Sequence, residues 1–223
     1  MILLDETEVR IEWTDIAKRQ DKRPCHDAGI RAPGVHLTDI IRYNWYGSLA
    51  PNSDLRTIRE KEADEDLNNL VMPLRMVLGL AFEAWIVGLY PELQWQPAPL
   101  KLDGIAGTMD GYSPGHSVDP RCNAIVVEEF KLTWKSLRDR HIMRETLWMW
   151  QLAGYCKMAG SRFGRLHVCW VNGDYQHGAD WGPRYMRYLI EFKQHELDRL
   201  WKGLFLKNRD KVGGEKYADE NVR

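Results

Sequence analysis

The chain has 223 residues, of which 44% are hydrophobic and 28% are charged. That composition is ordinary for a water-soluble protein and supplies a substantial core in one large domain or two small ones. The formal net charge of −1 neither supports nor excludes a polyanionic partner, because nucleic-acid binding needs only a local basic stripe.

Several other classes of protein are disfavoured. No apolar run reaches the length of a membrane span, and the longest candidate is interrupted by Glu83. Residues 1–6 lack the basic and apolar regions of a signal peptide. The four cysteines include no Cys-x-x-Cys, and a zinc site built from His167 and Cys169 would need an unusual ligand spacing. We therefore expect a protein of the reducing cytoplasm, meaning the host cytoplasm if the chain is phage-encoded, without membrane association.

The predicted elements begin after an N-terminal extension, residues 1–34, which ends in glycine and proline turn formers. A short helix follows over 39–45, with Thr38 as its cap. The charged run 56–65 predicts an exposed helix or a mobile segment. Apolar residues with i, i+3 and i+4 spacing then predict a long helix over 68–89.

The second half of the chain alternates strands and helices. We predict an extended segment near 94–97, strands near 104–112 and 124–132, a helix over 142–158, a strand near 165–171 and a last helix over 188–205. This order indicates an α/β fold with a central mixed β-sheet flanked by helices. The domain would cover 35–206, followed by a polar C-terminal tail, residues 207–223.

Two of the predicted strands bring acidic residues together. Residues 107–111 read Gly-Thr-Met-Asp-Gly, and a Glu-Glu-Phe-Lys run ends the following strand. Glu129 and Lys131 are two positions apart, so on a strand their side chains point to the same face. If the two strands pair as a hairpin, Asp110 approaches Glu129 and Lys131. The other candidate carboxylate, Glu128, points to the opposite face of the strand. The pattern predicts a catalytic group formed by Asp110, Glu129 and Lys131.

Such a group suits hydrolysis of a phosphodiester bond. Bound Mg²⁺ or Mn²⁺ activates a water, polarises the phosphorus and stabilises the leaving oxygen when carboxylates hold it with open water positions. We expect Asp110, Glu129 and the backbone carbonyl of Phe130 as metal ligands. Lys131 would orient the water, help to deprotonate it or offset developing charge. The alternative interpretation is a surface hairpin that carries a simple Glu–Lys pair.

Residues that follow the hairpin indicate contacts with a nucleic acid. A basic run comprises Lys131, Lys135, Arg138, Arg140, His141 and Arg144. Alone it would indicate a solvated helix face, but next to a carboxylate cluster it favours phosphate contacts, with Lys135 and Arg144 as candidates. Gln151 and Tyr155 lie at i and i+4 of the predicted helix, where they could bond to or stack on a strand end. The alternative is an ordinary core helix with a glutamine at its edge.

The order Gly-x-x-Asp, Glu-x-Lys and Gln-x-x-x-Tyr, which ends at Asp110, Lys131 and Tyr155, resembles the PD-(D/E)XK nuclease superfamily. The resemblance is closest to its RecB-like and phage (lambda-type) exonuclease-like branch, and it covers roughly residues 35–205. It implies a restriction-endonuclease-like core, in which a mixed sheet flanked by helices carries the metal site at one edge.

The same resemblance implies one further metal ligand. Many relatives carry Gly-x-x-x-His on the helix before the hairpin, with the histidine as a ligand. Here Gly79 and Glu83 occupy those positions, as in lambda-exonuclease-like members in which a glutamate serves. We expect Glu83 to bind metal, and a solvent-facing helix residue is the alternative. Relatives with an iron–sulfur cluster have a cysteine pattern that this chain lacks, so no cluster is expected.

Together, the residues and the resemblance predict a Mg²⁺- or Mn²⁺-dependent deoxyribonuclease. The resemblance favours an exonuclease that acts on DNA with a free end, in recombination, repair or phage DNA processing. Two alternatives stay open: a non-catalytic nucleic-acid-binding module on a nuclease fold, and a structure- or sequence-specific endonuclease.

Overall fold

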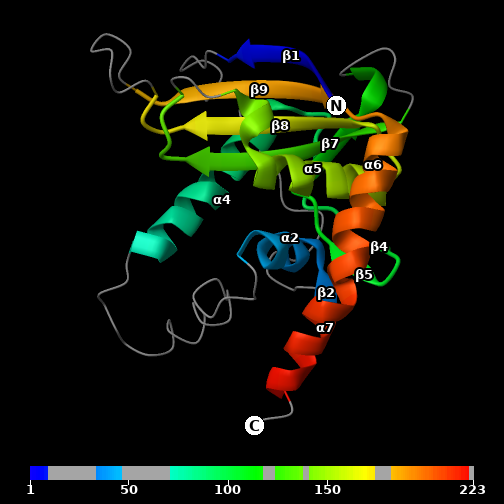
Figure 1. The fold of residues 1–223 in the computed structure, drawn as a ribbon. Coiled ribbons are helices and arrows are strands. Elements are labelled where there is room, and N and C mark those ends of the chain that lie inside the picture. Colours follow the sequence, from blue (N-terminus) through cyan, green and yellow to red (C-terminus); the bar gives the residue numbers. More distant parts are fainter. Residues whose placement is uncertain (10–33, 47–70, 118–123, 138–140, 174–181, 221–223) are drawn as a thin grey trace.

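The computed structural model describes residues 1–9, 34–46, 71–117, 124–137, 141–173 and 182–220. The charged segment at 56–65, expected as an exposed helix or a mobile segment, and the basic residues Arg138 and Arg140 lie outside these ranges. Figure 1 shows the arrangement of the described elements. In chain order they are β1 (Ile2–Glu8), β2 (Val35–His36), α2 (Leu37–Tyr46), α4 (Val71–Leu89), β3 (Gln94–Trp95), β4 (Leu100–Leu102), β5 (Ile105–Gly107), β6 (Gly111–Pro114), the 3₁₀ turn η3 (Gly115–Ser117), β7 (Ile125–Thr133), the 3₁₀ turn η4 (Ile142–Arg144), α5 (Thr146–Ala159), β8 (Phe163–Trp170), β9 (Arg184–Glu191), α6 (Gln194–Leu200), the π-helical turn η6 (Trp201–Leu206) and α7 (Lys207–Glu220).

The main sheet has the strand order β1-β9-β8-β7-β6-β3. Strands β7 and β8 run parallel, and the other neighbouring pairs run antiparallel. Parallel neighbours need a crossover connection, and α5 supplies it between β7 and β8. This arrangement confirms the predicted α/β class with a central mixed sheet flanked by helices.

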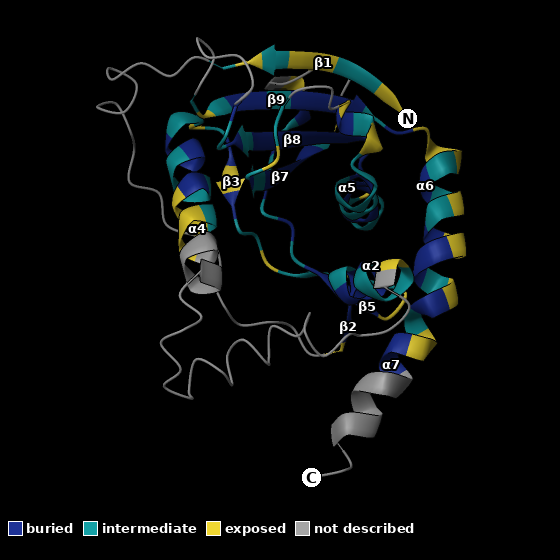
Figure 2. Cartoon of the chain, turned by 60° about the vertical axis from the view of Figure 1, so that its left-hand side comes forward, coloured by how far each residue is buried: buried dark blue, intermediate teal, exposed yellow. Residues whose placement is uncertain are grey.

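Helices cover both faces of the main sheet, as Figure 2 shows: α4 lies on one face, and α5 and α6 lie on the other. Alternation along β7 produces the two layers, because successive strand residues point to opposite faces. Phe130 packs with Phe82 and Ile86 of α4. Val127 joins the larger core that contains Leu152 of α5. The two faces of β7 therefore contribute to different cores.

A small second sheet of order β2-β5-β4 lies beside the C-terminal helices. The indole nitrogen of Trp201 donates to Asp103 Oδ2 at 2.8 Å, and Arg209 Nη1 donates to the Asp103 carbonyl at 2.8 Å. These bonds tie the β4–β5 turn to η6 and α7. Because β5 ends three residues before Asp110, the same bonds help to place the start of the predicted hairpin.

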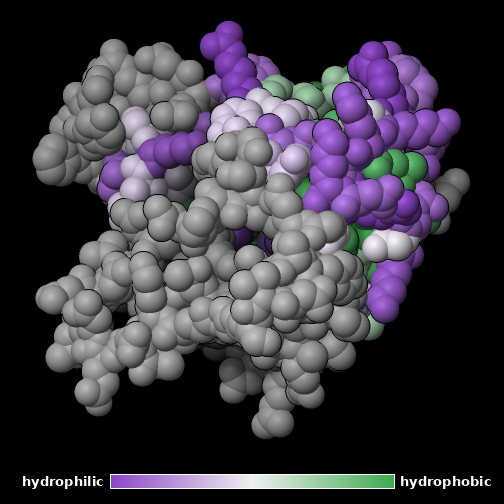
Figure 3. All heavy atoms as spheres, turned by 60° about the horizontal axis from the view of Figure 1, so that its bottom comes forward, coloured by the Kyte–Doolittle hydropathy of each residue, from purple (hydrophilic) through white to green (hydrophobic). Residues whose placement is uncertain are grey.

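The described part of the surface in Figure 3 is mainly hydrophilic, with smaller hydrophobic areas. None of the described helices has both the length and the apolar character that crossing a bilayer requires.

One predicted strand proved to be two. The expected strand near 104–112 is divided into β5, which belongs to the small sheet, and β6, which belongs to the main sheet. The interruption spans 108–110, so Asp110 lies at the entrance to β6. Thr38 also differs from its expected place, since α2 begins at Leu37 and includes Thr38 in its first turn.

The two ends of the chain are more ordered than an extension and a frayed tail would be. Residues Ile2–Glu8, within the expected extension, form β1 and pair with β9. The helix expected from 188 was wrong at its start, because Arg184–Glu191 form β9 and helical structure begins at Gln194. In the expected tail, Lys207–Glu220 form α7, and Val212 is buried in the main core.

Gly154 of α5 is a position where packing admits no side chain. A Cβ atom there would lie 2.5 Å from Leu37 Cδ1 and 3.0 Å from Phe205 Cζ, and both neighbours are fully buried. We expect Gly154→Ala to lower the free energy of unfolding by about 1–3 kcal/mol, the usual cost of overpacking. Urea unfolding measures this change.

Gly79 of α4 provides the matched control, because a Cβ atom added there would have no neighbouring atom within 4 Å. Gly79→Ala should leave stability unchanged or raise it by up to about 1 kcal/mol through helix propensity. Equal effects of the two substitutions would contradict the close approach of α5 to α2.

Candidate active site

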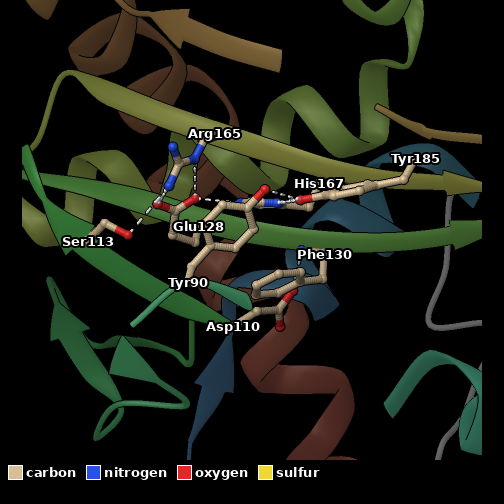
Figure 4. A network of polar contacts seen from close by, with 8 residues as sticks. All are labelled: Tyr90, Asp110, Ser113, Glu128, Phe130, Arg165, His167 and Tyr185. Atoms are coloured by element: carbon tan, nitrogen blue, oxygen red, sulfur yellow. Dashed lines mark hydrogen bonds and ion pairs between the residues drawn. The ribbon is translucent and has the colours of Figure 1, made fainter. Parts of the chain in front are cut away.

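Asp110 lies where the ladder between β6 and β7 ends. Gly111 is opposite Glu128 in that ladder, so Asp110 precedes the last paired residue. Its Oδ2 accepts the backbone N–H of Phe130 at 2.8 Å, which continues the pairing with a carboxylate in place of a carbonyl. Figure 4 shows Asp110 directly beside Phe130. The N–H and C=O of one strand residue point to the same side, so the Phe130 carbonyl also faces this edge.

Lys131 is held between two side chains on the α5 face of the sheet. Its ammonium forms an ion pair with Glu129 and donates to Gln151 Oε1 at 3.0 Å. Gln151 Nε2 in turn lies 3.5 Å from the hydroxyl of Tyr155. Tyr155 is only 3% exposed, so in this structure it supports Gln151 from the core. Contact of Tyr155 with a nucleic-acid strand stays a prediction.

Glu83 reaches the same edge from α4. Its charge interacts with Asp110 and Lys131, and the side chains of Trp95 and Gln96 at the end of β3 adjoin its carboxylate. The structure therefore brings Glu83, Asp110, Glu129 and Lys131 together from α4, the start of β6 and β7. Trp95 and Gln96 are members of the site's surroundings that the sequence analysis missed.

Burial makes the carboxyl groups of this cluster weak acids. It raises the pKa of Glu83 and of Glu129 to about 8, with a further contribution from the neighbouring Asp110 carboxylate. Burial also raises the pKa of Asp110, against the opposing effect of Lys131. Three carboxyl groups thus share one ammonium group, and their full ionisation is costly without additional positive charge.

Lys131 responds in the opposite way. Burial alone would lower its pKa, but the carboxylates of Glu129 and Asp110 outweigh burial and raise the pKa above the ordinary value. Its side chain therefore carries a positive charge at neutral pH. In this arrangement the ammonium can donate hydrogen bonds and offset negative charge, whereas it has no free electron pair with which to accept a proton.

The reverse side of β7 carries a second polar network, shown in Figure 4. Glu128 accepts from Arg165 Nε at 2.8 Å and from Arg165 Nη2 at 2.5 Å, and it lies 2.8 Å from His167 Nε2. Burial opposes its ionisation, but Arg165 and His167 more than compensate and lower the pKa of Glu128 to about 2. Glu128 is therefore a permanently charged, fully paired group outside the acidic cluster.

His167 joins this network to Tyr185, and burial lowers its pKa to about 4. An ionised Glu128 can only accept, so His167 Nε2 carries the proton and Nδ1 accepts from the Tyr185 hydroxyl at 2.5 Å. The ring also stacks on Phe130 at 4.8 Å between centroids. The network thus packs against the residue whose amide holds Asp110.

The two basic candidates lie beyond the cluster. Lys135 pairs with Glu145 at 2.5 Å and lies 5.0 Å above the ring of Trp148. Arg144 is exposed at the end of η4. Neither side chain contacts Asp110, Glu129 or Lys131 in any hydrogen bond or ion pair found among the described residues, and their contact with phosphates stays a prediction.

The donor chemistry of the cluster suits a hard divalent cation. Three carboxylates and one backbone carbonyl face the same edge, and Glu129 Oε2 is buried without a hydrogen-bond partner among the described residues. Oxygen ligands of this kind are those that Mg²⁺ and Mn²⁺ prefer. Within the described ranges, however, no three His, Cys, Asp or Glu side chains are already spaced to hold a metal ion. Metal binding would therefore need side chains to rearrange, starting with separation of Glu129 from Lys131.

Comparison with known proteins finds similarity to solved structures. No family model matches the chain, and no curated protein matches it. Among solved structures, the fold is similar to that of SSO0001, with 16% identity and a TM-score of 0.43 over 80% of this chain and 79% of that chain. It is also similar to the alkaline exonuclease LHK-Exo from Laribacter hongkongensis, with 11% identity and a TM-score of 0.44 over 85% of this chain and 95% of that chain. Similarity at this level does not identify an activity, so function is inferred from the site's own residues.

Glu128 and Glu191 provide a contrast between a buried and an exposed ion pair. Glu128→Gln would leave the buried guanidinium of Arg165 without a charged partner, so we expect a loss of about 3–5 kcal/mol in the free energy of unfolding. Glu191→Gln removes the pair with Arg162, whose side chain is 51% exposed, and should cost less than about 1 kcal/mol. Urea unfolding of both variants measures the difference, and equal losses would contradict this account of the network.

Glu129 should make the protein less stable as the pH rises. Its folded-state pKa of about 8 lies above the ordinary value of 4.5, so the folded protein keeps a proton that the unfolded chain releases between these pH values. Stability is fully present below about pH 4.5 and falls as the pH approaches 8. We expect Glu129→Gln to reduce this fall and, at pH 9 in EDTA, to raise Tm by at least about 2–4 °C, the shift that 1 kcal/mol produces in a domain of this size.

Thermal unfolding followed by circular dichroism from pH 5 to pH 9 would measure both effects. Glu191→Gln serves as the control, because that residue lies outside the cluster. If the Tm of Glu129→Gln declined with rising pH as steeply as that of the wild type, the proposed excess of carboxyl groups in the cluster would be contradicted.

Proposed function

We propose that this protein is a Mg²⁺- or Mn²⁺-dependent nuclease that hydrolyses phosphodiester bonds of DNA. The observation that carries the proposal is the convergence of Glu83, Asp110 and Glu129 with the ammonium of Lys131 at one sheet edge. A purely structural role gives no reason to place a buried and two half-buried carboxyl groups beside a single lysine, since each costs free energy there. A metal-dependent hydrolase needs this combination.

The residues of the chain would divide the work as follows. Glu83, Asp110, Glu129 and the Phe130 carbonyl would hold the cation, which activates water and polarises the phosphodiester when bound. With Glu129 engaged as a ligand, Lys131 would keep its bond to Gln151, and its ammonium could donate to a water or to a phosphate oxygen. Tyr155 would keep Gln151 in place from the core.

An exonuclease is the form of the activity that we favour. This preference comes from the resemblance to the RecB-like and phage exonuclease-like branch, whose members process DNA ends in recombination and repair. Lys135 and Arg144 follow the Glu-x-Lys strand and would contact the phosphates of the bound strand.

One observation favours the alternative of a non-catalytic binding module. Glu129 is paired with Lys131, and the described residues hold no three acidic or histidine side chains ready to bind a metal. A module of this kind would bind DNA through its basic residues and show no metal-dependent chemistry. Cleavage assays and metal calorimetry therefore separate the two proposals.

Lys131→Ala should abolish metal-dependent cleavage. We expect a loss of at least about 100-fold, which is typical when one donor to a developing negative charge is removed. The measurement is degradation of end-labelled linear DNA, single- and double-stranded, with Mg²⁺ or Mn²⁺ and with EDTA. A covalently closed circle is included, because an exonuclease spares it whereas an endonuclease cuts it.

Lys157→Ala is the matched control, since Lys157 pairs with Asp198 of α6, away from the cluster, and should keep full activity. Titration calorimetry with Mn²⁺ complements the assay, with Asp110→Ala expected to lose the binding that the wild type shows. DNA binding without cleavage under every condition, together with no metal binding, would favour the binding module.

A further inference from the structure

Two residues other than glycine have a positive φ in the described part of the chain: Gln96, at 45°, and Asp103, at 49°. Left-handed backbone is unfavourable for residues with a Cβ atom, and aspartate tolerates it better than glutamine. Such conformations persist only where the surrounding structure imposes them, and they gather at functional sites. Each of the two therefore calls for a separate explanation.

Asp103 has a structural explanation. It occupies the turn between β4 and β5, its carboxylate accepts the indole N–H of Trp201, and its carbonyl accepts from Arg209. The side chain and the backbone both stabilise the docking of the C-terminal helices. Nothing further is needed to account for its conformation.

Gln96 has a comparable explanation for its backbone but not for its side-chain oxygen. It follows β3, and its backbone N–H donates to the Asp110 carbonyl at 2.8 Å, so its backbone is fixed directly to the catalytic segment. Its side chain adjoins the carboxylate of Glu83. Its amide oxygen is buried and has no hydrogen-bond partner among the described residues. A buried acceptor without a donor costs free energy, and here it belongs to a side chain that adjoins Glu83.

We propose that Gln96 is a further ligand-binding residue of this site, whose amide oxygen binds the divalent cation alongside the carboxylates while its NH₂ group holds Glu83. The inference rests on the proposed metal-dependent function. An amide oxygen is a normal ligand for hard cations. An amide also adds no negative charge to a cluster in which three carboxyl groups already repel one another. In the metal-free protein, a glutamine therefore destabilises the fold less than a fourth acidic residue would.

The test uses two substitutions in the full chain. Gln96→Gly relieves the left-handed backbone and removes the amide, whereas Gln96→Glu keeps an oxygen at the same reach. Thermal unfolding in EDTA reports the structural role, and titration calorimetry with Mn²⁺ alone reports the ligand role. We expect Gln96→Gly to unfold at the wild-type temperature or a few degrees higher and to bind Mn²⁺ at least about 10-fold more weakly.

Gln96→Glu should bind Mn²⁺ at least as tightly as the wild type, with an unfolding temperature that is lower in EDTA and recovers when Mn²⁺ is added. A lower unfolding temperature of Gln96→Gly with unchanged Mn²⁺ affinity would make Gln96 a structural residue and overturn the inference. If the wild type binds Mn²⁺ and cleaves DNA, that result leaves the proposed function standing. A wild-type chain that neither binds Mn²⁺ nor cleaves DNA would overturn both.

Discussion

Strand β7 carries two adjacent glutamates into the interior, and the structure depends on how each buried charge is compensated. Glu128 has a guanidinium and an imidazole as partners, so it is ionised at every physiological pH. Glu129 faces the other way, and burial together with the neighbouring Asp110 carboxylate raises its pKa to about 8 despite the ammonium of Lys131. Because alternation along a strand puts neighbours on opposite faces, one element combines a stabilising network with an acidic site. Phe130 links them, since its ring stacks on His167 and its amide holds Asp110.

Local patterns predicted the centre of the site and much of the fold. The strand period brought Glu129 and Lys131 to one face and assigned Glu128 to the other, and the structure has this arrangement. The hairpin was also predictable, because a turn-rich segment separates two apolar runs. Apolar periodicity likewise predicted α4 and most of α5. In each case the information lies within a few residues of the element that it describes.

The features that the sequence did not reveal depend on distant partners. Gln94–Trp95 lie in the predicted extended segment, but their pairing with β6 was not predictable, so nothing local marked Gln96 as a neighbour of Asp110. His167 showed no sign of its partners, which come from β7 and β9. The helix expected from 188 was wrong at its start for the same reason. The apolar residues of Arg184–Glu191 fit both the helical and the strand period, and pairing with β8 and β1 makes this segment a strand.

The pairing of β1 with β9 joins residues that are almost the whole chain apart. Ile2 is opposite Glu191, and Glu8 is opposite Met186. Contacts of such long range form slowly, because the loop between them must close before the pairing contributes stability. During synthesis, β1 leaves the ribosome long before β9, so it stays unpaired until the residues between the two strands have been made. The outer edge of β9 should therefore be among the last parts of the sheet to be covered, which exposes both strands to association with other chains for longer than the rest of the fold.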